Sequence, residues 1–291
     1  MSDRETVALL GVGTMGAGMA RNLAASGFSL RLWNRSPCKA EALQSDTVTA
    51  AENPAAAVAG AGIVITMLWD ADSVADVIGE AAPGLAAGTI WIQTSTVGID
   101  GTARLADLAA KHGVILVDAP VLGTRKPAED GTLVVLASGP DDVHDRCAPV
   151  FDAIGSRTVW LGPAGQGSRV KLVANAWVLV VLDGVAECLT LANALGLDPA
   201  LFFEAIRGGA MDAPYVGLKG RAMLAGDFTP SFSLAGAAKD ADLILAAADA
   251  AGADVGVLER IGEYFGQAVD AGYGDLDMSA VYLAHQADPV D

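Results

Sequence analysis

The stretch Thr6-Val-Ala-Leu-Leu-Gly11-Val-Gly13-Thr-Met-Gly16 decides the fold of this 291-residue chain. Its apolar first half is typical of a buried strand, and apolar residues at helical spacing (Met15, Met19 and Leu23) predict that a helix follows. A glycine turn set between a strand and a helix is far more specific than the same glycines alone. The stretch therefore predicts a strand–turn–helix unit of the dinucleotide-binding type.

Each glycine of this turn has an expected role. Gly11 permits the sharp turn, Gly13 lets the backbone approach a pyrophosphate, and Gly16 lets the helix pack closely on the strand. The amides and the dipole at the helix N-terminus then hold the anion. We expect a cofactor-binding loop formed by Gly11, Val12, Gly13, Thr14, Met15 and Gly16.

A second predicted strand, residues 29–33, ends where the type of cofactor is selected. A ribose with a free 2′-hydroxyl is usually bound there by Asp or Glu, whereas a 2′-phosphate requires a cation. This chain has Asn34, Arg35 and Ser36 at that place, and a guanidinium pairs bidentately with phosphate. We expect NADP(H) in preference to NAD(H); the alternative is that Arg35 is only a solvated loop cation.

Composition limits the remaining possibilities. The net charge of −17 argues against nucleic acids and anionic membranes as partners. Three scattered cysteines and three distant histidines predict a reducing compartment and no disulfide, metal site or histidine-based triad. The charged N-terminal residues predict no signal peptide, and the most apolar segment, 172–182, is expected to be too short and too polar to span a bilayer. We expect a cytoplasmic protein.

Strands and helices alternate over the first half of the chain. This alternation is typical of a doubly wound, mostly parallel α/β sheet. The last two strands, which follow a loop at 123–131, are expected to add antiparallel pairing. Beyond the two strands already described, strands are predicted at 63–68, 89–93, 114–118, 133–137 and 157–161, with helices at 72–78, 101–112 and 141–154.

The pattern changes at Gly162-Pro-Ala-Gly165-Gln-Gly167, after which only helices are predicted. The first of them, 168–195, is apolar nearly all round, as a helix buried between layers or subunits should be. We expect a Rossmann domain at 1–163 and an all-α domain for substrate binding and dimerisation at 164–291, joined by this long interdomain helix. The other helices are predicted at 199–208, 218–224, 234–251 and 255–271.

Four polar clusters stand out as candidates for chemistry. Gln93-Thr-Ser95-Thr96 lies at the carboxyl end of a predicted strand, where its hydroxyls could meet nicotinamide or substrate, or simply cap the next helix. The loop 118–127 offers the amides of Gly123 and Thr124 to a substrate carboxylate. Two polar pairs lie in apolar helices. The first is Lys171 with Asn175 (i, i+4); the alternative is that the lysine snorkels to solvent and the asparagine caps a buried carbonyl. The second is Lys239 with Asp240, for which the alternative is an ion pair without a catalytic role.

Taken together, these segments resemble the β-hydroxyacid dehydrogenase family, which includes 3-hydroxyisobutyrate dehydrogenases and tartronate semialdehyde reductases. Within it, the chain looks similar to the glyoxylate/succinic semialdehyde reductase branch at 127–133, 209–211 and 274–281. The segments that carry the family resemblance are Gly11-Val-Gly-Thr-Met-Gly-Ala-Gly-Met-Ala-Arg-Asn-Leu23, Thr94-Ser-Thr-Val97, Asp118-Ala-Pro-Val-Leu-Gly123, Gly165-Gln-Gly-Ser-Arg-Val-Lys171 through Asn175, and Lys239-Asp240.

The resemblance implies roles for individual residues. Lys171 matches the catalytic lysine of the family and Asn175 its substrate-orienting amide. The chain departs from the family at Leu122, where a serine usually helps to hold the substrate's carboxylate, so a bulkier or less polar carbonyl compound becomes a candidate substrate. The implied cofactor contacts are Met67, Leu68, Thr96 and Lys239, and the expected substrate contacts are Ser95, Leu122, Gly123, Thr124 and Asp240.

The resulting hypothesis is hydride transfer from NADPH to a small aldehyde or keto compound, or the reverse oxidation of a β-hydroxyacid. Lys171 would act as the general acid/base, and the enzyme would be a homodimer or homotetramer without a metal. Two alternatives remain open at this point. One is an imine reductase on the same fold, and the other is a non-catalytic NADP-binding protein.

Overall fold

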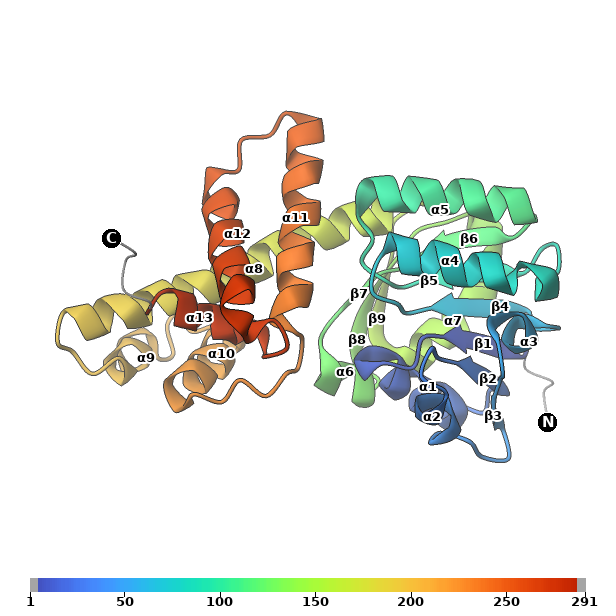
Figure 1. Ribbon diagram of the computed structural model, residues 1–291, viewed down its shortest axis with the longest axis horizontal. Helices are drawn as coiled ribbons and strands as arrows, with labels where there is room; N and C mark the ends of the chain where they lie inside the picture. Colours follow the sequence, from blue (N-terminus) through green and yellow to red (C-terminus); the bar gives the residue numbers. More distant parts are fainter. Residues whose placement is uncertain (1–4, 287–291) are drawn as a thin grey trace. The chain divides into compact units, whose positions relative to one another are not determined.

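The computed structural model describes residues 5–286, which divide into two compact units after Lys171 (Figure 1). The N-terminal unit is α/β, and the elements of the C-terminal unit are helices. The expected fold class, a Rossmann sheet followed by an all-α region, is confirmed.

The N-terminal unit is built on a parallel six-stranded sheet with the order β3-β2-β1-β4-β5-β6. Val7 of β1 pairs with Leu30 of β2 on one side and with Ile63 of β4 on the other. The strand order therefore reverses between β1 and β4, and ligands of such sheets bind at the carboxyl ends of these strands. The strands are β1 (Val7–Leu10), β2 (Leu30–Trp33), β3 (Val48–Ala50), β4 (Ile63–Thr66), β5 (Ile90–Gln93) and β6 (Ile115–Asp118).

Helices cover both faces of this sheet, which explains why its strands are continuous apolar runs. Met19 and Leu23 pack in the core on one face, and Trp91 and Leu105 in the core on the other. The first face is covered by α1 (Thr14–Ala25), α2 (Pro37–Glu41) and α7 (His144–Ile154). The second is covered by α3 (Pro54–Val58), α4 (Ala71–Ala81) and α5 (Gly98–His112), with the 3-10 turn η1 (Ala82–Gly84) after α4 (Figure 1).

A second, three-stranded sheet follows β6 in the chain. The expected antiparallel pairing is found between β7 and β8, whereas β8 and β9 pair in parallel. The loop predicted at 123–131 contains a short helix, α6, because i, i+4 pairs such as Arg125–Glu129 support it and Ala128 packs against Gly18. The elements are β7 (Val121–Leu122), α6 (Arg125–Glu129), β8 (Leu133–Ala137), η2 (Asp141–Val143) and β9 (Gly155–Trp160).

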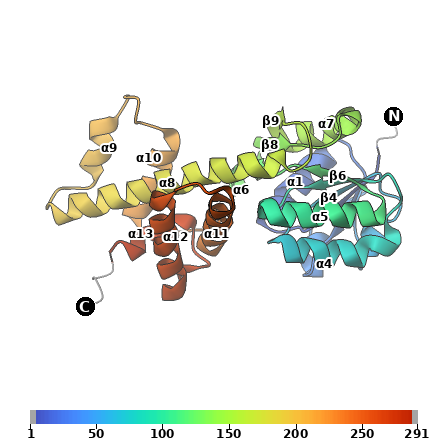
Figure 2. The same cartoon turned by 90° about the horizontal axis from the view of Figure 1, so that it is seen from above.

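The helices of the C-terminal unit pack around apolar side chains such as Leu182, Leu189 and Phe265. Helices α11 and α12 lie side by side in both views (Figure 2). The helices are α8 (Gln166–Ala194), α9 (Ala200–Ile206), α10 (Pro214–Ala225), α11 (Leu234–Ala251), α12 (Gly256–Ala268), η3 (Val269–Tyr273), η4 (Met278–Ala280) and α13 (Val281–Ala284).

Helix α8 corrects one expectation. The apolar segment 172–182 belongs to a continuous helix of 29 residues, whose most apolar window has a mean hydropathy of 1.8. By length and composition alone, α8 is therefore able to cross a membrane, because Asn175 interrupts the apolar pattern without ending the helix. The core helix of a soluble protein meets the same criteria, and α8 also carries the buried Asp183, which pairs with His285 beyond α13.

Candidate active site

The glycine turn after β1 has the geometry that its sequence predicts. Gly11 has φ +106°, and a Cβ there would lie 2.2 Å from the carbonyl oxygen of Met67. A Cβ on Gly16 would lie 2.0 Å from the carbonyl oxygen of Gly11. A Cβ on Gly13 would meet nothing within 4 Å. Packing therefore requires the first and third glycines, and the second leaves its backbone open to an approaching phosphate.

The N-terminus of α1 offers amides to an anion. The helix begins at Thr14, and its N-cap, Gly13, has no side chain to bind the first-turn amides, which also lack intrahelical partners. The preceding amide, that of Val12, donates to Asn34 Oδ1 at 2.9 Å. Asn34 thus braces the loop from the end of β2, and the exposed Arg35 and Ser36 follow it. These residues fit a pyridine dinucleotide.

The ends of β4 and β5 are tied together beside this turn. The amide of Leu68 donates to Ser95 Oγ at 2.8 Å, and Gln93 binds both the amide and the carbonyl of Ser95. Thr94 Oγ1 donates to the carbonyl of Thr66. The N-cap of α5 is Val97, whose side chain makes no capping hydrogen bond to the first-turn amides. Ser95 and Thr94 therefore hold two strand ends and do not cap α5, and Thr96 lies half-buried after them.

Lys171 is a buried cation in the first turns of α8, and it is the last residue of the N-terminal unit. Its side chain is only 8% exposed, and Nζ donates to the carbonyl of Val121 at 2.9 Å. A lysine held in this way does not extend to solvent. Val121 directly precedes the half-buried Leu122, the exposed Gly123 and then Thr124, which is the N-cap of α6. Lys171 thus contacts the loop in which the substrate residues are predicted.

Three predicted residues also meet in the C-terminal unit. Asn175 Nδ2 donates to Asp240 Oδ2 at 2.6 Å, and Lys239 Nζ forms an ion pair with Asp240 Oδ1 at 2.8 Å. Asp240 is buried, and Lys239 is about one-fifth exposed. Asn175 follows Lys171 by one helical turn along α8, so both project from the same face of that helix.

Sequence reasoning missed a buried network around Asp118, the last residue of β6. Its carboxylate accepts hydrogen bonds from the amide and the hydroxyl of Ser168 and from the hydroxyl of Ser138. Burial raises the pKa of Asp118, and these hydrogen bonds oppose the increase. Asp118 therefore does not face a substrate, although it begins the predicted substrate loop. A carboxylate at a strand end was visible in the sequence, but its partner 50 residues away was not.

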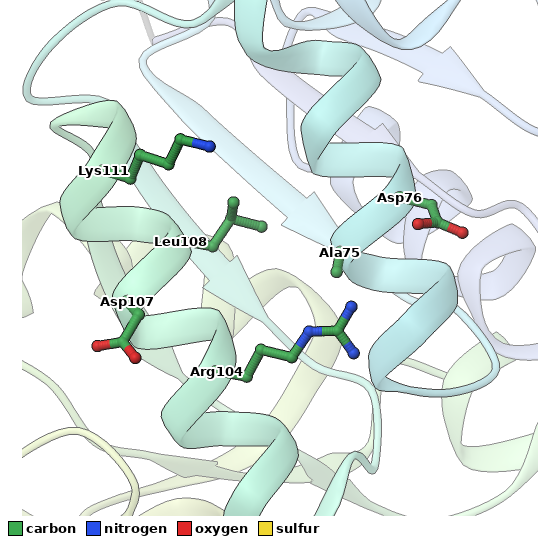
Figure 3. Close-up of a pocket in the computed structure, with 6 residues that line it drawn as sticks. All are labelled: Ala75, Asp76, Arg104, Asp107, Leu108 and Lys111. Carbon is green, nitrogen blue, oxygen red and sulfur yellow. The ribbon is translucent and has the colours of Figure 1, made fainter.

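A surface cavity of about 390 Å³ lies elsewhere in the N-terminal unit, between α4 and α5 (Figure 3). Its exposed Arg104 pairs with Asp72 of α4. None of the predicted site residues lines this cavity, so it is separate from the candidate site. The lining residues are Ala75, Asp76, Arg104, Asp107, Leu108 and Lys111.

Two family models together match most of the chain. Residues 6–162 match the NAD-binding domain of 6-phosphogluconate dehydrogenase, and residues 165–284 match the NAD-binding model of NADP-dependent 3-hydroxyisobutyrate dehydrogenase. Glyoxylate/succinic semialdehyde reductase 1 of Arabidopsis thaliana is 33% identical over 281 residues, which are 96% of this chain and 97% of that protein. The chain belongs to the β-hydroxyacid dehydrogenase family. It is an NAD(P)-dependent oxidoreductase that acts on CH–OH or C=O groups.

Solved structures agree with this β-hydroxyacid dehydrogenase assignment. The 3-hydroxyisobutyrate dehydrogenase of Mycobacterium tuberculosis, solved with L-serine, is 30% identical and covers 97% of this chain and 99% of its own, with a TM-score of 0.87. An imine reductase from Pseudomonas sp. shares the fold at 22% identity over 97% of this chain and 99% of its own, with a TM-score of 0.64.

Proposed function

We propose that this β-hydroxyacid dehydrogenase reduces a small aldehyde or keto compound with NADPH, or oxidises a β-hydroxyacid in the reverse direction, with Lys171 as the general acid/base. The observation that carries the proposal is the buried Lys171 Nζ, which is bound to the carbonyl of Val121 in the predicted substrate loop. The glycine turn after β1 would hold NADPH, and the chemistry supplied there would be a hydride for the carbonyl carbon. Lys171 donates the proton that the carbonyl oxygen needs to become a hydroxyl, and Asn175, one turn along α8, orients that oxygen.

The role of Lys171 is tested by Lys171→Ala. Removal of a positioned general acid costs about 10²- to 10⁴-fold in rate, so kcat should fall on that scale. NADPH should still bind, because the glycine turn is intact, and the enhancement of NADPH fluorescence measures this. Near-normal turnover of the variant would overturn the mechanism.

We propose NADP(H) as the preferred cofactor. The end of β2 has no carboxylate at residues 34–36, and the exposed guanidinium of Arg35 suits a 2′-phosphate. Arg35→Ala should raise the KM for NADPH by about tenfold, as expected for loss of a charge-assisted hydrogen bond, and leave the KM for NADH nearly unchanged. An unchanged KM for NADPH would refute the preference.

The substrate proposal depends on Leu122, which follows the carbonyl that binds Lys171. A half-buried leucine offers no hydrogen bond to a carboxylate, so the enzyme should accept bulkier or less polar carbonyl compounds. A panel with glyoxylate, succinic semialdehyde, methylglyoxal, 3-hydroxyisobutyrate and cyclic imines tests this. Leu122→Ser should increase kcat/KM for glyoxylate, and turnover of the imines alone would favour imine reduction, the second candidate.

We also propose that the enzyme is a cytoplasmic homodimer or homotetramer. Helix α8 exposes Val173 and Trp177, at 73% and 69%, and further along it Leu191. Apolar surface of this kind is typical of an interface between subunits. Sedimentation that shows only monomer would contradict the proposed oligomer.

A further inference from the structure

The buried carboxylate of Asp118 has no role in the proposed reaction, yet hydrogen bonds from Ser168 and Ser138 hold it. Oδ1 accepts from Ser168 Oγ at 2.7 Å, and Oδ2 accepts from the amide of Ser168 at 2.8 Å and from Ser138 Oγ at 3.2 Å. The side chain is fully buried. Asp118 is therefore bound to α8 and is not available to a ligand.

These hydrogen bonds fix the first turn of α8, where backbone amides lack intrahelical partners. Besides the amide of Ser168, the amide of Gly167 donates to Ser138 Oγ at 2.9 Å. A Cβ on Gly167 would lie 2.2 Å from the carbonyl oxygen of Leu136 and 2.9 Å from that of Asp118. Only a glycine lets the helix start approach β6 and β8 this closely, so the contact requires these particular residues.

Lys171 lies three residues after Ser168 and thus on the same side of α8. Its Nζ donates to the carbonyl of Val121, which lies three residues after Asp118 in the other chain segment. The segment 118–121 therefore binds α8 at two points one helical turn apart. One is the Asp118 carboxylate on Ser168, and the other is the Val121 carbonyl on Lys171.

We infer that Asp118 is a positioning residue for Lys171. Its two bonds to Ser168 fix the rotation of the first turn of α8 about the helix axis, and this rotation determines where Nζ lies. The inference rests on the proposed function, in which Lys171 supplies the proton. A catalytic group displaced by about 1 Å costs about 10²-fold in rate, whereas the glycine turn that binds the cofactor is unaffected.

Three variants in the full-length enzyme test this inference. Asp118→Ala removes the hydrogen bonds from Ser168 and Ser138 and should lower kcat by about 10²-fold, with the KM for NADPH within about twofold of wild type. Asp118→Asn keeps an oxygen for the Ser168 amide and can donate to the Ser168 hydroxyl, so it should restore most of the lost kcat. Ser168→Ala keeps the bond from its amide and should lie between the two. A kcat for Asp118→Ala within twofold of wild type would overturn the inference.

Combination with Lys171→Ala separates positioning from a general structural defect. If Asp118 acts through Lys171, then Asp118→Ala should change kcat by less than about twofold in the Lys171→Ala background. If the two losses multiply, Asp118 does not act through Lys171 and the inference is wrong. Should the double variant fail to fold, the same cycle with Ser168→Ala, which leaves the carboxylate in place, gives the answer.

A cap on another helix of the same unit provides the matched control. Asn53 Oδ1 accepts from the amide of Ala56 at the start of α3, which carries no predicted site residue. Asn53→Ala should leave kcat within about twofold of wild type. If Lys171→Ala itself retains turnover, the proposed function fails; if only the Asp118 series retains turnover, the function stands and the positioning role fails.

Discussion

Two buried carboxylates, Asp118 in the N-terminal unit and Asp277 in the C-terminal unit, are bound by different kinds of hydrogen-bond donor. Both bind an amide at a helix start, that of Ser168 for Asp118 and that of Ser279 for Asp277. Asp277 also has a cation, because Lys219 Nζ lies 2.7 Å from its Oδ1. The donors that reach Asp118 are instead neutral amides and hydroxyls.

The pKa values of the two groups shift in opposite directions as a result. Burial raises the pKa of Asp118, and its neutral hydrogen bonds do not reverse the shift. Burial also raises that of Asp277, but the hydrogen bond and charge of Lys219, with the Ser279 and Ser231 donors, bring its pKa down to about 2. The ion pair makes Asp277 a stabilising link between α10 and η4. The neutral hydrogen bonds of Asp118 instead hold the start of α8, one turn before Lys171, which is the positioning role inferred above.

The largest expected effect is on stability, from Asp277→Ala. The variant leaves the buried Lys219 ammonium without its partner, which costs about 3–5 kcal/mol of unfolding free energy. Urea denaturation measures the loss, and kcat of the folded fraction should stay within about twofold of wild type. Asp227→Ala, at an exposed carboxylate in the same unit, should lower the free energy of unfolding much less. If Asp277→Ala and Asp227→Ala lowered the free energy of unfolding equally, the buried ion pair would not be a special source of stability.

Asp118→Ala should lower the free energy of unfolding less than Asp277→Ala does, but it should lower kcat more. Asp118→Ala loses hydrogen bonds between neutral donors and a carboxylate but strands no cation, so we expect a loss of about 1–3 kcal/mol. Its kcat should nevertheless fall by about 10²-fold, as argued above. The comparison breaks down if Asp118→Ala destabilises the fold as much as Asp277→Ala and leaves kcat unchanged.

The smallest effect is the dependence of stability on pH, which should have opposite signs for the two groups. The folded pKa of Asp277, about 2, lies below its ordinary 3.8, so this group contributes about 2 kcal/mol above pH 4 that is lost as the pH falls toward 2. The folded pKa of Asp118 is raised, so its contribution is full below the ordinary value and is lost as the pH rises through the folded pKa.

Unfolding free energies of wild type, Asp277→Asn and Asp118→Asn between pH 2 and pH 7 check these signs. Subtraction of the Asp277→Asn curve from that of wild type should leave a step that rises with pH between about 2 and 4. The same subtraction for Asp118→Asn should leave a step that falls with pH, starting near pH 4. Two steps of the same sign would show that the neutral donors around Asp118 outweigh its burial.

Local sequence patterns were enough to predict much of this molecule. The predicted helix 234–251 coincides with α11, and the strand Val7–Leu10 and the glycine turn have the expected conformations. The i, i+4 spacing of Lys171 and Asn175 was enough to predict that both lie on one face of a helix. The short strand Val48–Ala50 and helix α6 escaped prediction, because part of what stabilises them lies elsewhere in the chain: β2 pairs with the strand, and Gly18 packs against Ala128 of the helix.

The sequence by itself determined the alternation of strands and helices, the dinucleotide turn, the negative net charge and the type of residue available for proton transfer. Only the tertiary structure decided which distant groups meet: Asn34 with the Val12 amide, Asp118 with Ser168, and Asn175 with Asp240, across 22, 50 and 65 residues of chain. Periodicity reveals which face of an element is buried, because burial repeats along the element. It does not reveal the partner of a buried polar group, because that partner is chosen by the packing of whole elements against one another.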